Sequence, residues 1–247
     1  MASQRNSRAQ AEVEHGKRLS VADPEAIWGW GTAAGQLRAR RRANLVLAGA
    51  QIGPGDRVLE LGCGTGMFTE MFATSGADIV AVDVSDELLA RARARGIPNV
   101  RFLCRRFEDC EFDKPFDAII GSSVLHHLDV DDALTMILRF LKPGGLFSFA
   151  EPNYLNPQVF AERRLRFIRP LFWHVSPDET AFVRWRFQVQ LTTSGFDEVV
   201  ITPYDWVHPA TPARLIPFVR AVGGALERTP IIREFSGSLY INARRRR

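Results

Sequence analysis

The sequence predicts an α/β fold in which a mostly parallel sheet is covered by helices. From Arg57 onward, short apolar runs alternate with helical patterns, which is typical of parallel strands joined by helical crossovers. The 247 residues are 46% hydrophobic and 24% charged, so the chain can bury a sizeable core and is not disordered, collagen-like or a coiled coil. This length fits one α/β domain with an appended segment.

The first 52 residues are expected to form an arm and a helical cover ahead of the main domain. Residues 1–22 are polar and lack a periodic apolar face, which indicates a loose arm. Asp23 and Pro24 then begin a helix, because proline is accommodated in a first turn. One or two amphipathic helices follow before a break at Gly53-Pro54-Gly55, and they carry a basic cluster: Arg38, Arg40, Arg41 and Arg42.

The rest of the chain divides into alternating elements. We expect strands at 58–61, 79–83, 100–104, 116–121 and 146–151, with helices at 66–74, 86–94 and 131–141. Lys142-Pro143-Gly144-Gly145 forms the turn into the fifth strand. An aromatic and basic stretch then interrupts the pattern as an insertion at about 154–175. A helix from Ser176 to Ser194, a strand at 199–203, a helix at 211–226 and a last strand at 236–242 complete the chain.

Charge, cysteine content and hydropathy exclude several classes of protein. The net charge of +4 is matched by the final four arginines, Arg244 to Arg247, which we interpret as a solvated tail. Three cysteines without paired ligand spacing indicate neither a disulfide framework nor a structural metal. No apolar run reaches the roughly 18 residues of a membrane-spanning helix, and the amino terminus lacks an apolar signal core. We therefore expect a cytoplasmic protein.

A glycine-rich loop follows the first strand of the expected sheet. Val58 to Gly66 is an apolar strand that runs into glycines at alternate positions and then directly into a helix. Glycine permits positive φ angles and close approach of the backbone to a ligand, while the start of the helix offers free amide groups. Taken alone, the loop fits a tight turn or a dinucleotide-binding loop, although the latter needs a small residue where Met67 stands.

A carboxylate ends the second strand, where it would lie beside this loop. Asp83 stands 21 residues after Gly62, and a carboxylate at that strand tip can accept both hydroxyls of a ribose. The alternative is that Asp83 caps the next helix, but Ser85 and Asp86 are better placed for that. The pair of loop and carboxylate indicates a cofactor that contains a nucleoside.

Four segments in normal order and spacing resemble the successive motifs of class I S-adenosylmethionine-dependent methyltransferases: residues 60–66, Asp83, residues 116–128 and residues 141–145. They are most similar to the branch of ubiquinone-biosynthesis and small-molecule O- and N-methyltransferases. The resemblance spans 57–151 and continues more weakly to Asn242. It implies a three-layer, Rossmann-like fold over 53–247, with a seven-stranded sheet whose last strand is antiparallel and inserted beside the fifth.

The resemblance also implies S-adenosylmethionine as the cofactor, bound across the carboxyl ends of the first strands. Glu60 would steady the loop, and Asp83 would hold the ribose with Val84 packed on the adenine. The loop would approach the methionine part of the cofactor, through Gly62, Cys63, Gly64 and Gly66.

Three further residues complete the implied cofactor site. Relatives usually carry an aspartate where this chain has Arg106, so the backbone of Phe107, or Glu108, would hold the adenine amino group. Ser122 would lie beneath the sulfonium, or would only fill the strand end. Arg42 would pair with the cofactor carboxylate, unless it faces solvent as most helical arginines do.

Methyl transfer from a sulfonium is an in-line displacement that needs alignment and no metal. His127 is the candidate general base for a hydroxyl acceptor, and packing between helix and sheet is its alternative role. His126 is expected to be structural or exposed. Trp28 and Trp30 would form a lid over the cofactor or act as packing anchors. The residues after the fifth strand are candidates for binding the acceptor or for capping loops: Glu151, Asn153 and Tyr154.

The acceptor is predicted to be a small molecule, a sugar or a lipid-linked compound methylated on oxygen or nitrogen. Gly121 to Val124 replaces the proline-rich tetrapeptide of enzymes that methylate bases, so we expect no nucleic-acid partner. The insertion mixes aromatic residues with arginines, which suits a planar or lipid-like anionic acceptor, or peripheral contact with a membrane. The alternatives are a nucleic-acid methyltransferase that uses its arginine clusters and a nicotinamide-dependent reductase.

Overall fold

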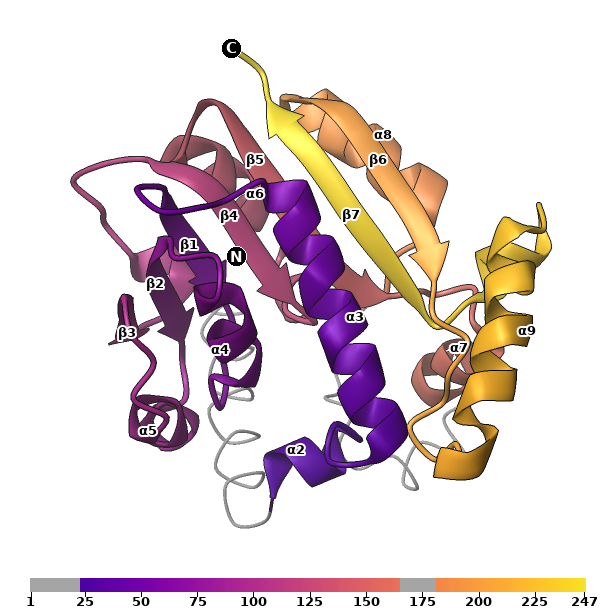
Figure 1. Ribbon diagram of the computed structural model, residues 1–247. Coiled ribbons are helices and arrows are strands. Elements are labelled where there is room, and N and C mark those ends of the chain that lie inside the picture. The colour runs from indigo at the N-terminus through magenta and orange to yellow at the C-terminus, as the bar shows by residue number, and fades with distance from the viewer. Residues whose placement is uncertain (1–22, 165–180) are drawn as a thin grey trace.

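The computed structural model describes residues 23–164 and 181–247, and the strands of these residues form one seven-stranded sheet (Figure 1). The strand order is β3-β2-β1-β4-β5-β7-β6. The strands are β1 (Arg57–Leu61), β2 (Asp78–Asp83), β3 (Val100–Cys104), β4 (Phe116–Ser122), β5 (Leu141–Pro152), β6 (Phe196–Tyr204) and β7 (Ser238–Arg245).

The first five strands run parallel, and β7 pairs antiparallel with both β5 and β6. This confirms the predicted sheet with an antiparallel last strand inserted beside the fifth. The carboxyl ends of β1 to β5 meet at one edge, which is the lower edge in Figure 1. Ligands of open α/β sheets bind outside this edge, so the topology places the predicted motifs together.

Helices cover both faces of the sheet in three layers. On one face lie α3 (Ala33–Ala50), α4 (Met67–Ala73) and α5 (Asp86–Ala94), and on the other lie α6 (Val130–Phe140) and α8 (Arg184–Ser194). Alternate residues of β1 serve the two sides: Val58 faces α3 and α4, whereas Leu59 and Leu61 face α6. This period of two explains why the central strands read as continuous apolar runs.

The long helix α3 packs unusually close to the sheet. Thr32 caps its amino end by accepting a hydrogen bond from Gly35 N–H (2.9 Å), and Ser148 Oγ donates to the Val46 carbonyl oxygen at 2.9 Å. A Cβ on Gly49 would lie only 1.9 Å from the Tyr240 hydroxyl, so glycine is required there. The helix is therefore fixed across β5 and β7, in front of the sheet in Figure 1.

The remaining elements connect or flank the sheet. They are the helices α2 (Pro24–Ile27), α7 (Pro157–Arg164) and α9 (Ile216–Arg228), and the 3₁₀ turns η1 (Phe107–Asp109), η2 (Leu125–His127), η4 (Ala213–Leu215) and η5 (Ile232–Phe235). Each helix of the described residues is too short or too polar to cross a bilayer.

Two predictions about the carboxyl-terminal half need correction. The terminal arginines are not simply a solvated tail, because Arg244 and Arg245 belong to β7, and Arg244 Nε pairs with Glu198 at 3.0 Å. The helix that ends at Ser194 begins at Arg184, since residues 181–183 are not helical. The predicted start at Ser176, the arm at 1–22 and residues 165–175 of the insertion lie outside the described residues.

Candidate active site

The glycine loop between β1 and α4 adopts the conformation that its glycines permit. Gly62, Gly64 and Gly66 all have positive φ angles, of 64°, 51° and 77°. A Cβ on Gly62 would lie 2.5 Å from Val124, and one on Gly66 would lie 2.9 Å from the Cβ of Ala92. The alternate glycines are therefore needed both for the turn and for close packing.

Asp83 lies at the tip of β2 and is hydrogen-bonded to the glycine loop. Its Oδ2 accepts a hydrogen bond from Gly64 N–H at 2.8 Å, and its Oδ1 accepts one from Ser85 N–H at 2.9 Å. Burial raises the pKa of Asp83, although these amide bonds favour the ionised form. A carboxylate offers about four acceptor positions, so each oxygen keeps room for a ligand hydroxyl. Ser85 caps α5, as expected.

Glu60 is buried behind the loop and carries an unsatisfied oxygen. Its Oε2 has no hydrogen-bond partner among the described residues, and Thr69 of α4 lies beside it. Burial raises the pKa of Glu60 from 4.5 to about 8, Thr69 opposes this, and the charge of Asp83 adds to it. An oxygen buried without a partner in this way can accept a hydrogen bond from a ligand donor at the loop.

Arg42 reaches from α3 to the ends of β4 and β7. Its Nη1 donates to Ser122 Oγ (3.3 Å) and to Ser123 Oγ, and its Nη2 donates to Ser238 Oγ at 2.8 Å. The side chain lies over the Trp30 ring and is only 4% exposed, yet it forms no ion pair with any described residue. A buried guanidinium held by neutral hydroxyls fits an anionic ligand group.

The neighbouring arginines of α3 have carboxylate partners within the protein. Arg38 Nε donates to Asp205 at 2.7 Å, and Arg41 forms two bonds to Glu227, at 2.8 and 2.6 Å. Arg42 differs from both. It points toward the carboxyl edge of the sheet, and it has no acidic partner among residues 23–164 and 181–247.

The segment around α2 covers the glycine loop. Thr65 Oγ1 donates to Glu25 Oε1 at 2.9 Å, and Arg95 bonds both Glu25 and the Thr65 carbonyl oxygen. A Cβ on Gly64 would lie 3.6 Å from the Trp28 ring, so Trp28 lies beside the loop as a lid residue would. Trp30 is buried, as expected for a packing anchor.

Glu151 holds the η2 turn that carries the two histidines. It is fully buried, accepts bonds from Val124 and Leu125 N–H (2.9 Å each) and lies 2.7 Å from His126 Nδ1. His126 and these amides lower the pKa of Glu151 despite its burial. The half-buried His127 ring stacks on His126 at 4.1 Å. Glu151 thus caps this turn, which is the alternative role expected for it, and its acceptor-binding role stays a prediction.

His127 follows β4 and Asp83 ends β2, and these two parallel strands flank β1, so both residues lie at the same edge of the sheet. A positive charge on His127 would lower the pKa of Asp83. The structure therefore brings the candidate base to the same edge as the candidate ribose ligand.

The other predicted site residues take varied positions. Asn153 is buried and its Nδ2 donates to the carbonyl oxygens of Glu234 (2.7 Å) and Ser236 (2.8 Å), so it ties β5 to η5. Tyr154 packs edge-on against Phe160 of α7. The acceptor-binding roles of both stay predictions. Of the other predicted cofactor residues, Cys63 is buried in the loop, Val84 is half-buried after β2, and the Phe107 ring is buried in the core; their cofactor roles stay predictions.

The central part of the chain is similar to known methyltransferases. Residues 58–145 match the protein family described as a methyltransferase domain. An uncharacterized methyltransferase, sll0829 of Synechocystis sp., is 34% identical over 111 residues, which are 43% of this chain and 52% of that protein. A ubiquinone biosynthesis O-methyltransferase of Bradyrhizobium sp. is 30% identical over 164 residues, 61% of this chain and 64% of that protein. The chain thus spans about half to two thirds of the length of these relatives.

Solved structures share the fold across nearly the whole chain. One is a chain in the complex between the Haloferax volcanii Trm112 methyltransferase activator and a putative methyltransferase, with a TM-score of 0.68, 22% identity, and coverage of 94% of this chain and 98% of that one. The N-methyltransferase NodS of Bradyrhizobium japonicum, in complex with S-adenosylhomocysteine, has a TM-score of 0.61, 18% identity and coverage of 94% and 97%. At such identities the likeness concerns the fold. The match to the methyltransferase domain family is confined to residues 58–145, and this central part is where the chain resembles class I S-adenosylmethionine-dependent methyltransferases.

Proposed function

We propose that the protein transfers a methyl group from S-adenosylmethionine to an oxygen or nitrogen atom of a small-molecule, sugar or lipid-linked acceptor. The observation that carries this proposal is the 2.8 Å hydrogen bond between Gly64 N–H and Asp83. It joins the glycine loop to a carboxylate suited to a ribose, at the sheet edge where ligands bind.

The residues at this edge fit the parts of the cofactor. Asp83 is the candidate acceptor for the two ribose hydroxyls, and Arg42 is the candidate partner for the carboxylate of the methionine part. The buried carboxyl of Glu60 lies behind the glycine loop, and its Oε2 has no hydrogen-bond partner among the described residues. When bound, S-adenosylmethionine supplies a methyl group on an activated sulfonium, so the protein's task is mainly alignment of the acceptor about 3 Å from that methyl.

The η2 turn carries the candidate general base. Glu151 holds the backbone of η2 through two amides and is hydrogen-bonded to His126, which supports a fixed position for the turn that carries His127. A neutral imidazole at His127 would accept the proton that a hydroxyl or ammonium acceptor loses on methylation.

The names of similar proteins support the class of acceptor without narrowing the atom. They include ubiquinone biosynthesis O-methyltransferases, the N-methyltransferase NodS and a Haemonchus contortus phosphoethanolamine N-methyltransferase. The cyclase SpnF shares the fold too, at a TM-score of 0.62 and 22% identity, so the fold alone does not carry the activity. The proposal therefore depends on the site residues.

The two alternative functions receive less support from the site. Arg38 and Arg41 are paired with Asp205 and Glu227, which leaves fewer arginines of α3 to contact phosphates of a nucleic acid. A reductase would bind a nicotinamide dinucleotide, which the experiment below measures directly.

Calorimetric titration with S-adenosylmethionine, S-adenosylhomocysteine and NADPH tests the proposal. We expect binding of the first two and none of NADPH, and binding of NADPH alone would overturn it. The role of Arg42 is tested with Arg42→Met, which should weaken S-adenosylhomocysteine at least tenfold, about 1.4 kcal/mol. It should leave 5′-methylthioadenosine unchanged, because that compound lacks the carboxylate. Arg40→Met, an exposed position on the same helix, is the matched control.

A further inference from the structure

An apolar surface lies on the outside of the protein at α9 and η5. Ten large hydrophobic side chains of the described residues are exposed, and six of them lie between 215 and 235. These six define the α9–η5 surface: Leu215, Phe218, Val222, Ile231, Ile232 and Phe235. Such a concentration of exposed apolar side chains on one surface marks an interaction site more often than scattered single residues do.

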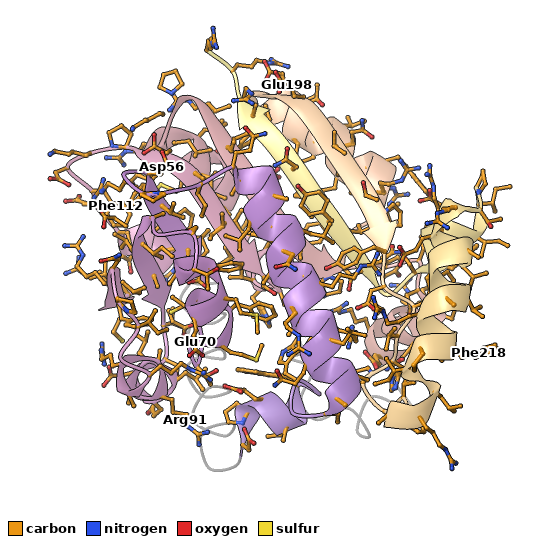
Figure 2. All side chains as sticks on the ribbon, viewed as in Figure 1. Asp56, Glu70, Arg91, Phe112, Glu198 and Phe218 are labelled. Carbon is orange, nitrogen blue, oxygen red and sulfur yellow. The ribbon has the colours of Figure 1, made fainter. Side chains whose placement is uncertain are left out.

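The apolar residues of α9 are spaced so that they lie on one exposed side of the helix. Leu215, Phe218, Val222 and Ala225 follow one another at helical intervals and are all exposed. Gly223 is the one fully buried residue of α9, with a Cβ position 3.1 Å from Trp206, so the helix rests on the body by its opposite side. Figure 2 shows Phe218 pointing away from the protein, and its side chain is 68% exposed.

The apolar side chains protrude rather than line a hollow. Ile231 is 77% exposed and has a φ of 70°, a conformation that β-branched residues rarely adopt. Protruding side chains of this kind fit a soft surface into which they can insert better than they fit a rigid groove.

The charges beside this surface are positive and without acidic partners. Arg214 lies just before α9 and Arg228 ends it; both are exposed, and neither forms an ion pair within 4 Å of a described carboxylate. The two acidic residues between 211 and 236 are already neutralised: Glu227 pairs with Arg41 at 2.6 Å, and Glu234 pairs with Arg184 at 2.8 Å. The surface therefore offers an anionic partner these two arginines and no free carboxylate.

We propose that the α9–η5 surface binds the anionic surface of a lipid bilayer, with Phe218 and Ile231 inserted among the lipids and with Arg214 and Arg228 at the headgroups. Apolar insertion combined with arginine contacts is the recognised physical basis of interfacial binding. This inference goes beyond methyl transfer and does not depend on it. It would place the carboxyl edge near the membrane, because α9 follows the carboxyl end of β6.

Vesicle sedimentation with the full chain tests this proposal. The probes are vesicles of phosphatidylcholine alone and vesicles with roughly one third phosphatidylglycerol. We expect binding to the anionic vesicles and a loss of at least tenfold in the double variant Phe218→Asp, Ile231→Asp. Val189→Asp on α8 is the matched control, because Val189 is 62% exposed on a different element and its replacement should leave binding unchanged.

Charge and self-association give separate readouts. The double variant Arg214→Ala, Arg228→Ala should also lose binding, and added salt should weaken binding of the wild type because exposed charges are screened. The proposal is overturned if the wild type binds neither kind of vesicle, or if the variant Phe218→Asp, Ile231→Asp binds as well as the control. It is also overturned if light scattering shows a dimer that this variant abolishes, since the surface would then bind a second copy. Circular dichroism checks that each variant is folded.

Discussion

Glu60 provides a sharp test of the electrostatics behind the glycine loop. Burial raises the pKa of its carboxyl from 4.5 to about 8, so the folded protein keeps a proton that the unfolded chain releases at neutral pH. Below the pKa of the unfolded chain, Glu60 is protonated in both states and does not alter the free energy of unfolding. As the pH rises from there toward 8, the unfolded chain releases the proton while the folded protein keeps it, so the free energy of unfolding falls. Glu60→Gln removes the titration and nearly preserves the volume of the side chain.

The magnitude follows from the two pKa values. Each pH unit between them costs about 1.4 kcal/mol, so from about pH 5 to about pH 9 the wild type should lose about 4 kcal/mol of unfolding free energy relative to Glu60→Gln. This is an upper figure, because the protein relaxes around a buried charge. The variant should therefore be distinctly more stable than the wild type at the alkaline end and similar to it at the acidic end.

Urea unfolding of both proteins across this pH range is the assay. Glu111→Gln is the control, because Glu111 is exposed and its replacement should not alter the pH dependence of stability. Parallel curves for the wild type and Glu60→Gln would refute the reasoning, since the carboxyl would then be ionised in both states and not buried in an unfavourable position.

Three further changes test the remaining parts of the site. His127→Asn should lower turnover at least about a hundredfold and keep cofactor affinity, and full activity would remove the base assignment. Glu151→Gln should lower the free energy of unfolding by about 1–3 kcal/mol by weakening the bonds to η2 and His126. Because the pKa of Glu151 is lowered, this contribution should vanish as the pH falls, and a pH-independent difference would contradict it. Gly66→Ala should destabilise by about 1–3 kcal/mol through its positive φ and its clash with Ala92, as thermal unfolding would show.

The helices and strands in the centre of the fold are predicted well because neighbouring residues in the sequence determine where each of them begins and ends. The helix at Asp86–Ala94 and the strand at Val100–Cys104 agree with the prediction to the residue, and Ser85 caps the helix as expected. The glycine loop and Asp83 could be paired in advance because parallel neighbouring strands bring their carboxyl ends to one edge.

Long-range partners explain the parts that the sequence did not predict. Arg244 and Arg245 read as a tail, yet β7 extends through them because β5 and β6 offer partners on both sides. Glu151 caps a turn whose amides are 26 and 27 residues away in the sequence, and no local pattern reveals which turn it caps. The ion pairs of Arg38 and Arg41 likewise depend on residues of the carboxyl-terminal half.

The proposed function depends above all on Asp83, the carboxylate at the tip of β2, as the group that binds the ribose of the cofactor. Calorimetric titration of Asp83→Ala with S-adenosylhomocysteine tests it most directly, with Asp86→Ala in the adjoining helix as the control. The account predicts that Asp83→Ala weakens binding at least tenfold, about 1.4 kcal/mol, while Asp86→Ala binds as the wild type does. Unchanged affinity in a folded Asp83→Ala protein would contradict the account.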